Sequence, residues 1–233
     1  MSYFNRAFFR RLWLEWRLTG FVVLFVIVPL KSSFADWNWV PSGSMNPTIL
    51  EGDMFYVNKV AYDLRIPLTL KRVNRWADPD KGDIVVLFSP EDETRLVKRV
   101  IGVPGDRLEM RNNILFVNGE RLQYGPLPAD ALEGLETDLA SRAVFARETL
   151  GEREHAVMAI PGIASERRSF APVQVPEGKY FVMGDNRDLS QDSRSFGFAD
   201  REAIVGEATH VILSFNILDW YQPRLNRFFT ALE

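Results

Sequence analysis

A serine in a restricted loop is the first residue of this sequence that could act as a nucleophile. Ser44 lies in the segment Pro41-Ser42-Gly43-Ser44-Met45-Asn46-Pro47-Thr48. The two prolines each fix φ at about −65° and the glycine permits close backbone approaches, so the loop is expected to present Ser44 in a defined orientation. The hydroxyl of Ser42 could join the backbone N–H of Ser44 in stabilising the anion of a tetrahedral intermediate. An ordinary Ser/Gly/Pro turn would explain the same residues.

No histidine lies near Ser44 in the sequence, so a different base would have to activate it. The chain has two histidines, His155 and His210, and neither accompanies a recognisable serine-hydrolase motif. Lys98 lies between aliphatic neighbours in the strand-like run 95–101. Its ordinary pKa of about 10.4 would have to fall to about 7 for it to be a useful base, and burial in an apolar site acts in that direction. A solvated strand lysine is the alternative.

Two further segments are typical of ordered turns rather than of linkers. Val103-Pro104-Gly105-Asp106 has the Pro-Gly order of a type II turn, which would end the strand that carries Lys98. The segment 184–197 is rich in Asp, Arg and Ser and follows the strand-like run 180–183. Paired Asp and Arg side chains can cross-link such a loop. A structured polar loop is therefore expected beside the serine and lysine segments.

With these segments the chain resembles the type I signal peptidases, the bacterial membrane-bound leader peptidases. The matching segments occur in the order found in that family: the serine box 41–48, Gly52-Asp53 with the strand 54–57, the lysine box 98–106 and the last box 184–194. The similarity runs from about residue 40 to about residue 215. Several such boxes in one order are specific for the family.

The resemblance implies roles for four residues of the reaction centre. Ser44 matches the nucleophile and Lys98 the general base. Ser42 matches the side-chain member of the oxyanion hole, beside the N–H of Ser44, and Ser190 matches the hydroxyl that orients the lysine ammonium. The chain departs from the family at Leu189, where an asparagine is usual. Because Ser190 is retained, this departure concerns the hydrogen bonding of the loop more than the mechanism.

The resemblance also implies two ion pairs of the scaffold. Asp185 matches a partner of Arg99, and Asp192 and Arg194 match a second pair. We interpret both pairs as structural rather than chemical.

The substrate contacts implied by the resemblance involve five residues. Met45 and Ile49 match apolar walls of a shallow pocket for the small residue before the scissile bond. An extended peptide could add as a strand between the segment leading into the serine and the strand formed by Arg95, Leu96 and Val97.

The implied function is that of a membrane-anchored serine endopeptidase that removes signal peptides from exported preproteins. Cleavage would follow an Ala-x-Ala-like sequence and pass through an acyl-enzyme, with no metal or cofactor. The net charge of −3 argues against nucleic-acid binding, and the absence of cysteine excludes a thiol nucleophile and a thiolate metal site. Two alternatives are a specialised relative that matures one client, such as a conjugative pilin, and an inactive membrane-tethered module that binds exported segments.

The N-terminal region predicts a membrane anchor. The apolar run 19–30 is shorter than the ~20 residues that cross a bilayer core, so we expect one spanning helix from about Leu12 to about Phe34. A cleavable signal peptide is the alternative, but 29–35 offers a poor small-residue cleavage site. Basic residues are concentrated before the span: Arg6, Arg10, Arg11 and Arg17, against Lys31 after it. This asymmetry predicts a cytoplasmic N-terminus and a periplasmic catalytic domain at the bacterial inner membrane.

The rest of the chain predicts a mainly β, antiparallel catalytic domain with a small accessory insertion. Short strands are expected at 54–60, 83–88, 94–101, 107–110, 114–117, 179–183 and 209–215, with a hairpin turn at Asn118-Gly119. The expected organisation is an anchor over 1–36, a catalytic core over 37–120 and 176–233, and a variable insertion over 121–175. Within the insertion, the acidic stretch 128–153 predicts a solvated segment with a helix over 129–149.

Aromatic and basic residues are mixed near the C-terminus. They are Trp220, Tyr221, Arg224, Arg227, Phe228 and Phe229. The mixture predicts contact with anionic lipid, and a frayed amphipathic tail is the equal alternative.

Overall fold

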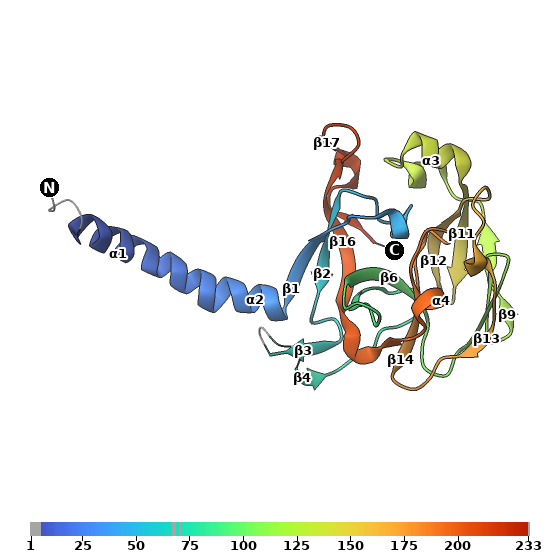
Figure 1. Cartoon of the computed structure of the whole chain (residues 1–233), viewed down its shortest axis with the longest axis horizontal. Helices are drawn as coiled ribbons and strands as arrows, with labels where there is room; N and C mark the ends of the chain where they lie inside the picture. The colour runs from blue at the N-terminus through green and yellow to red at the C-terminus, as the bar shows by residue number, and fades with distance from the viewer. Residues whose placement is uncertain (1–5, 67–68, 70, 233) are drawn as a thin grey trace.

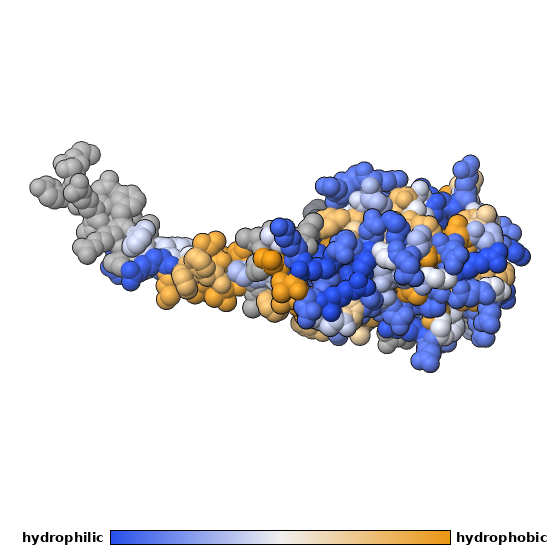
Figure 2. All heavy atoms as spheres, turned by 90° about the horizontal axis from the view of Figure 1, so that it is seen from below, coloured by the Kyte–Doolittle hydropathy of each residue, from blue (hydrophilic) through white to orange (hydrophobic). Residues whose placement is uncertain are grey.

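The computed structural model describes residues 6–66, 69 and 71–232, which form a long N-terminal helix and a β domain (Figure 1). The helix consists of α1 (Arg6–Val22), a π-helical turn η1 (Val23–Ile27) and α2 (Val28–Ser33). Its stretch Glu15–Ser33 has 19 residues and a mean hydropathy of 1.4, which is long and apolar enough to cross a membrane. Because only 6% of this stretch is buried against the protein, its apolar side chains lack a protein core to enter (Figure 2).

The β domain is built on one large antiparallel sheet, which includes the first strand after the helix and the last strand before the C-terminus. Its strand order is β1-β2-β16-β5-β6-β14-β15, and β17 and β18 also pair with β16. Alternating burial along β2, and burial of Ile84 to Leu87 in the Ile/Val-rich β5, explain why these sequences form strands with an apolar face or an apolar interior position. The bounds are β1 Ala35–Trp39, β2 Asp53–Asn58, β5 Ile84–Phe88, β6 Arg95–Gly102, β14 Lys179–Met183, β15 Ala199–Asp200, β16 Ile204–Asn216, β17 Gln222–Pro223 and β18 Thr230–Ala231.

Smaller sheets flank the large one. A four-stranded sheet has the order β13-β7-β8-β9, a three-stranded sheet has the order β10-β11-β12, and β3 pairs with β4. Their bounds are β3 Asp63–Arg65, β4 Arg72–Arg75, β7 Arg107–Arg111, β8 Ile114–Val117, β9 Glu120–Arg121, β10 Gln123–Gly125, β11 Val144–Leu150, β12 Arg153–Ala159 and β13 Phe170–Gln174. Short helices connect the strands: η2 Gly43–Met45, η3 Ala129–Leu132, α3 Thr137–Arg142, η4 Glu166–Arg168, α4 Ser193–Phe196, η5 Arg201–Ala203 and η6 Leu225–Arg227.

The mainly β prediction is confirmed, and each of the seven expected strands overlaps an observed one. The turn at Asn118-Gly119 is confirmed as well, because both residues have positive φ (54° and 88°) and join Val117 to Glu120 across a two-residue hairpin. The turn after β6 has the expected form, with Gly105 at φ 91° and Asp106 N donating to Val103 O at 3.0 Å.

The helix predicted over 129–149 is wrong for most of its length. Only α3 is α-helical in that range, and β11 begins at Val144 and pairs with β12 along seven residues. The solvated interpretation fails in the same place, since Glu148 and Leu150 on β11 are 0% and 2% exposed. Tertiary pairing overrides the local helical preference of the Ala- and Glu-containing sequence. Moreover, β13 pairs with β7, which ties the end of the insertion to the preceding part of the domain.

The C-terminal segment is not frayed, and its basic residues do not face outward. Strands β17 and β18 pair with β16, and Arg227 donates to the buried carboxylate of Asp53 at 2.6 Å. Arg224 donates to Glu51 O at 3.0 Å. Both guanidinium groups are therefore engaged by the domain. The exposed part of this segment carries large apolar side chains, with Trp220 94% exposed, beside polar residues such as Asp219 and Gln222.

Candidate active site

The side chains of Ser44 and Lys98 lie next to each other, although they belong to different elements. Ser44 lies in the 3₁₀ turn η2, and Lys98 lies in the middle of β6. Lys98 Nζ donates to Ser44 Oγ at 2.8 Å, although the two residues are 54 positions apart. The contact has hydrogen-bond geometry suited to proton transfer between an alcohol and an amine.

Local hydrogen bonds and the sheet fix the loop that carries Ser44. Val40 N donates to Asp53 O at 2.9 Å and Gly52 N donates to Val40 O at 3.1 Å, so both ends of the loop are joined to each other. Inside it, Asn46 N donates to Gly43 O at 3.1 Å and closes the turn. The serine is therefore held by backbone contacts on both sides of the turn.

Asn186, which the sequence reasoning missed, binds the serine loop from the opposite side. Its backbone N–H donates to Ser44 O at 3.2 Å, and its side-chain Nδ2 donates to Gly43 O at 3.0 Å. Neighbouring Gly184 is pressed against the same carbonyl, because a Cβ built there would lie 2.3 Å from Ser44 O. The position of Asn186 inside the last polar segment was the signal that could have identified it.

Burial sets the acidity of Lys98. The residue is 2% exposed, faces Val85 across β5 and β6, and donates to Val97 O at 2.9 Å. Burial lowers the pKa of Lys98 to about 8, while the negative charges of Asp192 and Asp185 act in the opposite direction. Roughly one lysine in ten is then neutral at pH 7, compared with fewer than about one in a thousand for a solvated lysine.

Ser190 reaches the site, and the two hydrogen bonds of Lys98 Nζ go to Ser44 Oγ and Val97 O. Ser190 is fully buried, and its Oγ lies 2.3 Å from the position that a Cβ on Gly184 would occupy, next to Ser44 O. The second Lys98 hydrogen bond goes to the Val97 carbonyl and not to this hydroxyl. The structure therefore does not show the expected contact between Ser190 and Lys98.

Ser42 precedes η2 as an exposed residue in an extended conformation, with φ −145° and ψ 149°. Its side chain does not cap the turn. The Ser42 hydroxyl is therefore not used to cap the turn that carries Ser44.

Two buried ion pairs lie beneath the serine and the lysine. Arg99 donates to both oxygens of Asp185 at 2.9 Å, and each side chain is 1% exposed. Thr48 Oγ1 also donates to Asp185, at 2.6 Å, so the pair is joined to the serine loop. Although burial opposes it, Arg99 holds the pKa of Asp185 below its ordinary range.

The second pair closes the loop that carries Ser190. Arg194 donates to the two oxygens of Asp192 at 2.9 and 2.7 Å. Asp192 in turn accepts from Gly184 N at 3.0 Å, and Arg194 donates to Arg187 O at 2.6 Å. These contacts cross-link the two ends of the loop, which keeps Gly184 and Asn186 against the serine.

Met45 and Ile49 are completely buried in the core and are not accessible walls of a pocket. Both are 0% exposed and pack in a cluster with Val40. The partly exposed residues packed against that cluster include Phe88 and Val97, at the end of β5 and in β6. Met45 and Ile49 therefore support an apolar surface from behind rather than lining it.

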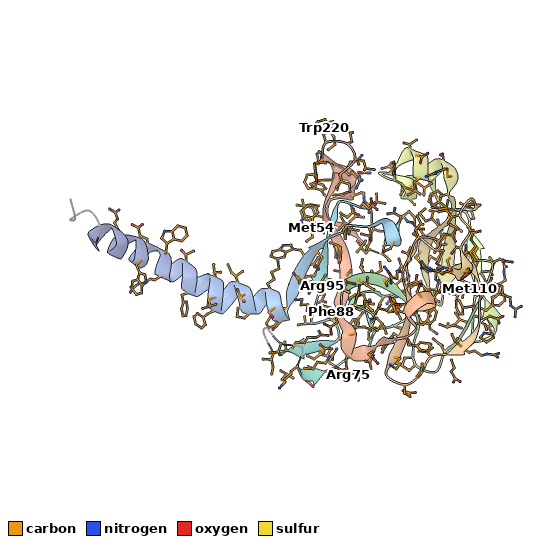
Figure 3. The ribbon with its side chains drawn as sticks, in the orientation of Figure 1. Met54, Arg75, Phe88, Arg95, Met110 and Trp220 are labelled. Atoms are coloured by element: carbon orange, nitrogen blue, oxygen red, sulfur yellow. The ribbon has the colours of Figure 1, made fainter. Side chains whose placement is uncertain are left out.

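An unpaired strand edge lies next to the serine. Strand β6 pairs with β5 from Arg95 to Arg99, whereas β14 pairs with β6 only from Arg99 to Gly102. Arg95, which begins β6 and is labelled in Figure 3, donates to Asp36 at 3.1 Å and to Asn38 at 2.9 Å, and both acceptors lie on β1. An extended peptide can pair with the backbone along this edge as far as Lys98, where the Val97 carbonyl also accepts from Lys98 Nζ at 2.9 Å.

A buried polar cluster in the insertion holds the last polar loop. Glu148 on β11 accepts from Arg187 at 2.6 and 3.0 Å, and His155 on β12 lies 3.2 Å from the same carboxylate. Although burial opposes it, the Arg187 guanidinium lowers the pKa of Glu148 below its ordinary range. Met158 N donates to Asp185 O at 2.9 Å, which adds a backbone contact. The β11–β12 hairpin thus braces the loop of Asn186.

Within the described ranges 6–66, 69 and 71–232, no group of three His, Cys, Asp or Glu side chains could hold a metal ion.

Comparison with known proteins gave concordant matches. The family model described as signal peptidase, peptidase S26, matches residues 13–213. Signal peptidase I of Pseudomonas fluorescens is 36% identical over 226 residues, covering 91% of this chain and 75% of the relative, and that of Pseudomonas aeruginosa is 35% identical over 227 residues with the same shares. A crystal structure of a signal peptidase I from Enterococcus faecalis is 30% identical, covers 56% of this chain and 97% of that one, and has a TM-score of 0.35.

Proposed function

The chain belongs to the signal peptidase family, peptidase S26, which is a family of serine peptidases, and on that premise we propose that Ser44 and Lys98 are its catalytic pair. The single observation that carries this proposal is the 2.8 Å contact between Lys98 Nζ and Ser44 Oγ at a buried lysine. The proposed reaction is hydrolysis of a peptide bond that joins a signal peptide to an exported protein.

The proposed mechanism begins with neutral Lys98. Its amine takes the proton of Ser44 Oγ as that oxygen attacks the scissile carbonyl. The backbone N–H of Ser44 and the hydroxyl of Ser42 stabilise the oxyanion that forms. The ammonium of Lys98 then gives its proton to the departing amine, and an acyl-enzyme remains on Ser44. Water, deprotonated by the same lysine, attacks this ester; the lysine ammonium then protonates the departing Ser44 Oγ, and the signal peptide leaves with a free carboxylate.

The free edge of β6 supports an extended substrate. A peptide lying between this edge and the end of β1 would pair with Arg95 and Val97 and bring its carbonyl to Ser44. The apolar surface at Phe88 and Val97 has tightly packed residues behind it, so it leaves room for small side chains before the scissile bond. These features support cleavage after an Ala-x-Ala-like sequence.

The long helix supports a membrane location. Most of the described side chains of Glu15–Ser33 are exposed, and a spanning helix removes the apolar ones among them from water. The excess of arginine before the span supports a cytoplasmic N-terminus and a catalytic domain on the opposite, periplasmic side. Exported preproteins would then meet the enzyme with their apolar segments in the same bilayer.

The proposal is tested with the full chain in proteoliposomes and a purified preprotein. Wild-type protein should release one signal peptide, identified by mass spectrometry, while Ser44→Ala and Lys98→Ala should each lower kcat by about a thousandfold or more. Ser141→Ala and Lys179→Ala are matched controls, because both residues lie away from the site and should leave the rate unchanged.

The same assay separates the alternatives. Retained cleavage in Ser44→Ala or Lys98→Ala would end the proposed catalytic pair. Absence of cleavage in wild type, with preprotein bound, would favour an inactive binding module. Cleavage of one precursor from a panel of many would identify a specialised peptidase.

A further inference from the structure

The membrane helix enters the catalytic domain without a linker. The helix ends at Ser33 and β1 begins at Ala35, so only Phe34 lies between them (Figure 1). Strand β1 is immediately paired with β2 along five residues, from Ala35 opposite Asn58 to Trp39 opposite Met54. A paired strand that starts one residue after a helix leaves few backbone torsions free between the two.

A buried lysine caps the end of this helix. Lys59, which follows β2, is 7% exposed, and its Nζ donates to Lys31 O at 3.0 Å and to Ser32 O at 3.2 Å. Its backbone N–H donates to Phe34 O at 3.0 Å. The last carbonyls of a helix have no partner inside the helix and form the negative end of its dipole. Lys59 supplies both hydrogen bonds and positive charge at that end.

One carboxylate joins the capped helix to the strands that border the substrate edge. Asp36 on β1 lies 3.2 Å from Lys59 Nζ, 3.6 Å from Lys31 Nζ and 3.1 Å from Arg95 Nη1. Arg95 begins β6, three residues before Lys98. The end of the helix and the edge beside the catalytic lysine are therefore connected through two consecutive ion pairs.

We propose that Lys59 and Asp36 form a rigid joint that fixes the height of Ser44 above the membrane, so that the enzyme selects a cleavage site by its distance from the bilayer. This inference rests on the proposed function. The apolar segment of a preprotein is held at a defined depth by the same bilayer that holds the enzyme's helix. Small residues before a scissile bond recur often in a sequence. If Ser44 lies at a fixed height above the bilayer, only the small-residue site at the matching distance from the bilayer reaches it and is cleaved.

The joint is tested with a preprotein that carries three identical Ala-x-Ala sites at increasing distances from its apolar segment. Wild-type enzyme in proteoliposomes should cut predominantly at one of them. Lys59→Met keeps the length of the side chain and removes the cap, so it should spread cleavage over at least two sites and lower the rate at the preferred one by about tenfold. Lys59→Met should cleave a short soluble peptide with the same site, and no apolar segment, at a rate within about twofold of that of the wild-type enzyme.

Two further variants isolate the joint from folding effects. Insertion of Gly-Ser-Gly after Ser33 leaves the core of the domain intact and should spread cleavage in the same way. Lys59→Arg retains the charge and donors and should restore cleavage at one site. Lys179→Met, which breaks an ion pair of Lys179 with Asp200 at the surface, is the matched control and should behave like wild type.

The outcomes distinguish the joint from the proposed function. Single-site cleavage by both Lys59→Met and the insertion variant would overturn the joint, and so would an equal loss on peptide and preprotein, because that pattern reports damage to the catalytic domain alone. Failure of wild-type enzyme to cut either substrate would instead contradict the proposed function.

Discussion

Lys98 Nζ lies 2.8 Å from Ser44 Oγ, and the lysine is 2% exposed. The serine is presented by a turn held by backbone hydrogen bonds at both ends, and the lysine by a strand within the large sheet. The pair therefore has the geometry and the burial that proton transfer to an amine requires.

The proposed base predicts the pH dependence of peptide hydrolysis. Only neutral Lys98 can accept the serine proton, and burial lowers its pKa to about 8. We expect kcat/KM for a short peptide to rise between about pH 7 and pH 9, with a midpoint near 8. Initial rates measured from pH 6 to pH 10 check this. A midpoint at the ordinary value of a solvated lysine, above about 10, would contradict the assignment.

Burial of the lysine also predicts that its replacement stabilises the protein. The pKa of Lys98 falls from 10.5 to about 8 on folding, which is equivalent to about 3 kcal/mol of folding free energy lost at pH 7. Lys98→Met removes this cost at similar volume. We expect its free energy of unfolding at pH 7 to exceed that of wild type by up to about 3 kcal/mol.

The sign of the pH effect provides the control for that experiment. Between about pH 8 and pH 10.5 the unfolded wild type binds more protons at Lys98 than the folded protein does, so wild-type stability rises with pH. The advantage of Lys98→Met should shrink over this window and disappear above it. Urea unfolding followed by tryptophan fluorescence measures the free energy of unfolding of wild type and of Lys98→Met at each pH. An advantage independent of pH would exclude lysine desolvation as its cause.

The buried pair beneath the site predicts a large loss of stability when one partner is removed. Asp185→Ala leaves Arg99 buried without its carboxylate, and we expect a loss of about 3–5 kcal/mol. Thr48→Val removes one hydrogen bond to Asp185 and should cost about 1 kcal/mol. Thermal unfolding of the two variants in detergent checks the order.

An exposed pair offers the matched comparison for Asp185. Glu154 lies 3.3 Å from Arg147 with its side chain 54% exposed, so Glu154→Ala should cost less than about 1 kcal/mol. Equal losses in Glu154→Ala and Asp185→Ala would refute the energetic importance of burial at the Arg99–Asp185 pair.

The apolar tip near the C-terminus predicts binding to lipid that depends little on lipid charge. Trp220 is 94% exposed, and Figure 3 places it at the tip of the β domain, whereas Arg224 and Arg227 are bound to the domain. We expect Trp220→Ala to weaken vesicle binding of the protein lacking residues 1–33 by about tenfold. Flotation with zwitterionic and anionic vesicles measures this.

A second exposed apolar residue is the control for Trp220. Val144 is 58% exposed on β11, and Val144→Ala should leave flotation unchanged. A strong requirement for anionic lipid would show that basic groups, rather than the tryptophan, provide the binding energy.

The large features of the fold could be predicted because they rest on local signals. The strand at β6 follows from its β-branched residues and from the Pro-Gly turn after it, and the hairpin at Asn118-Gly119 follows from residues that adopt positive φ. The β11–β12 hairpin could not be predicted in this way. Its alanines and glutamates favour a helix locally, and the β11–β12 pairing that overrides this preference is accompanied by a tertiary contact of Glu148 with Arg187.

The candidate site, like the fold, could be predicted from the sequence only in part. The proline-bounded serine loop, the lysine among aliphatic residues and the apolar N-terminal run were readable from residue types and short spacing, because each depends on local chain geometry or hydropathy. Their meeting was decided by tertiary structure, as were the depth of Lys98, the hydrogen bonds of Asn186 to the serine loop and the cap that Lys59 places on the N-terminal helix. These depend on contacts between segments far apart in the chain, and desolvation exists only once those segments have packed together.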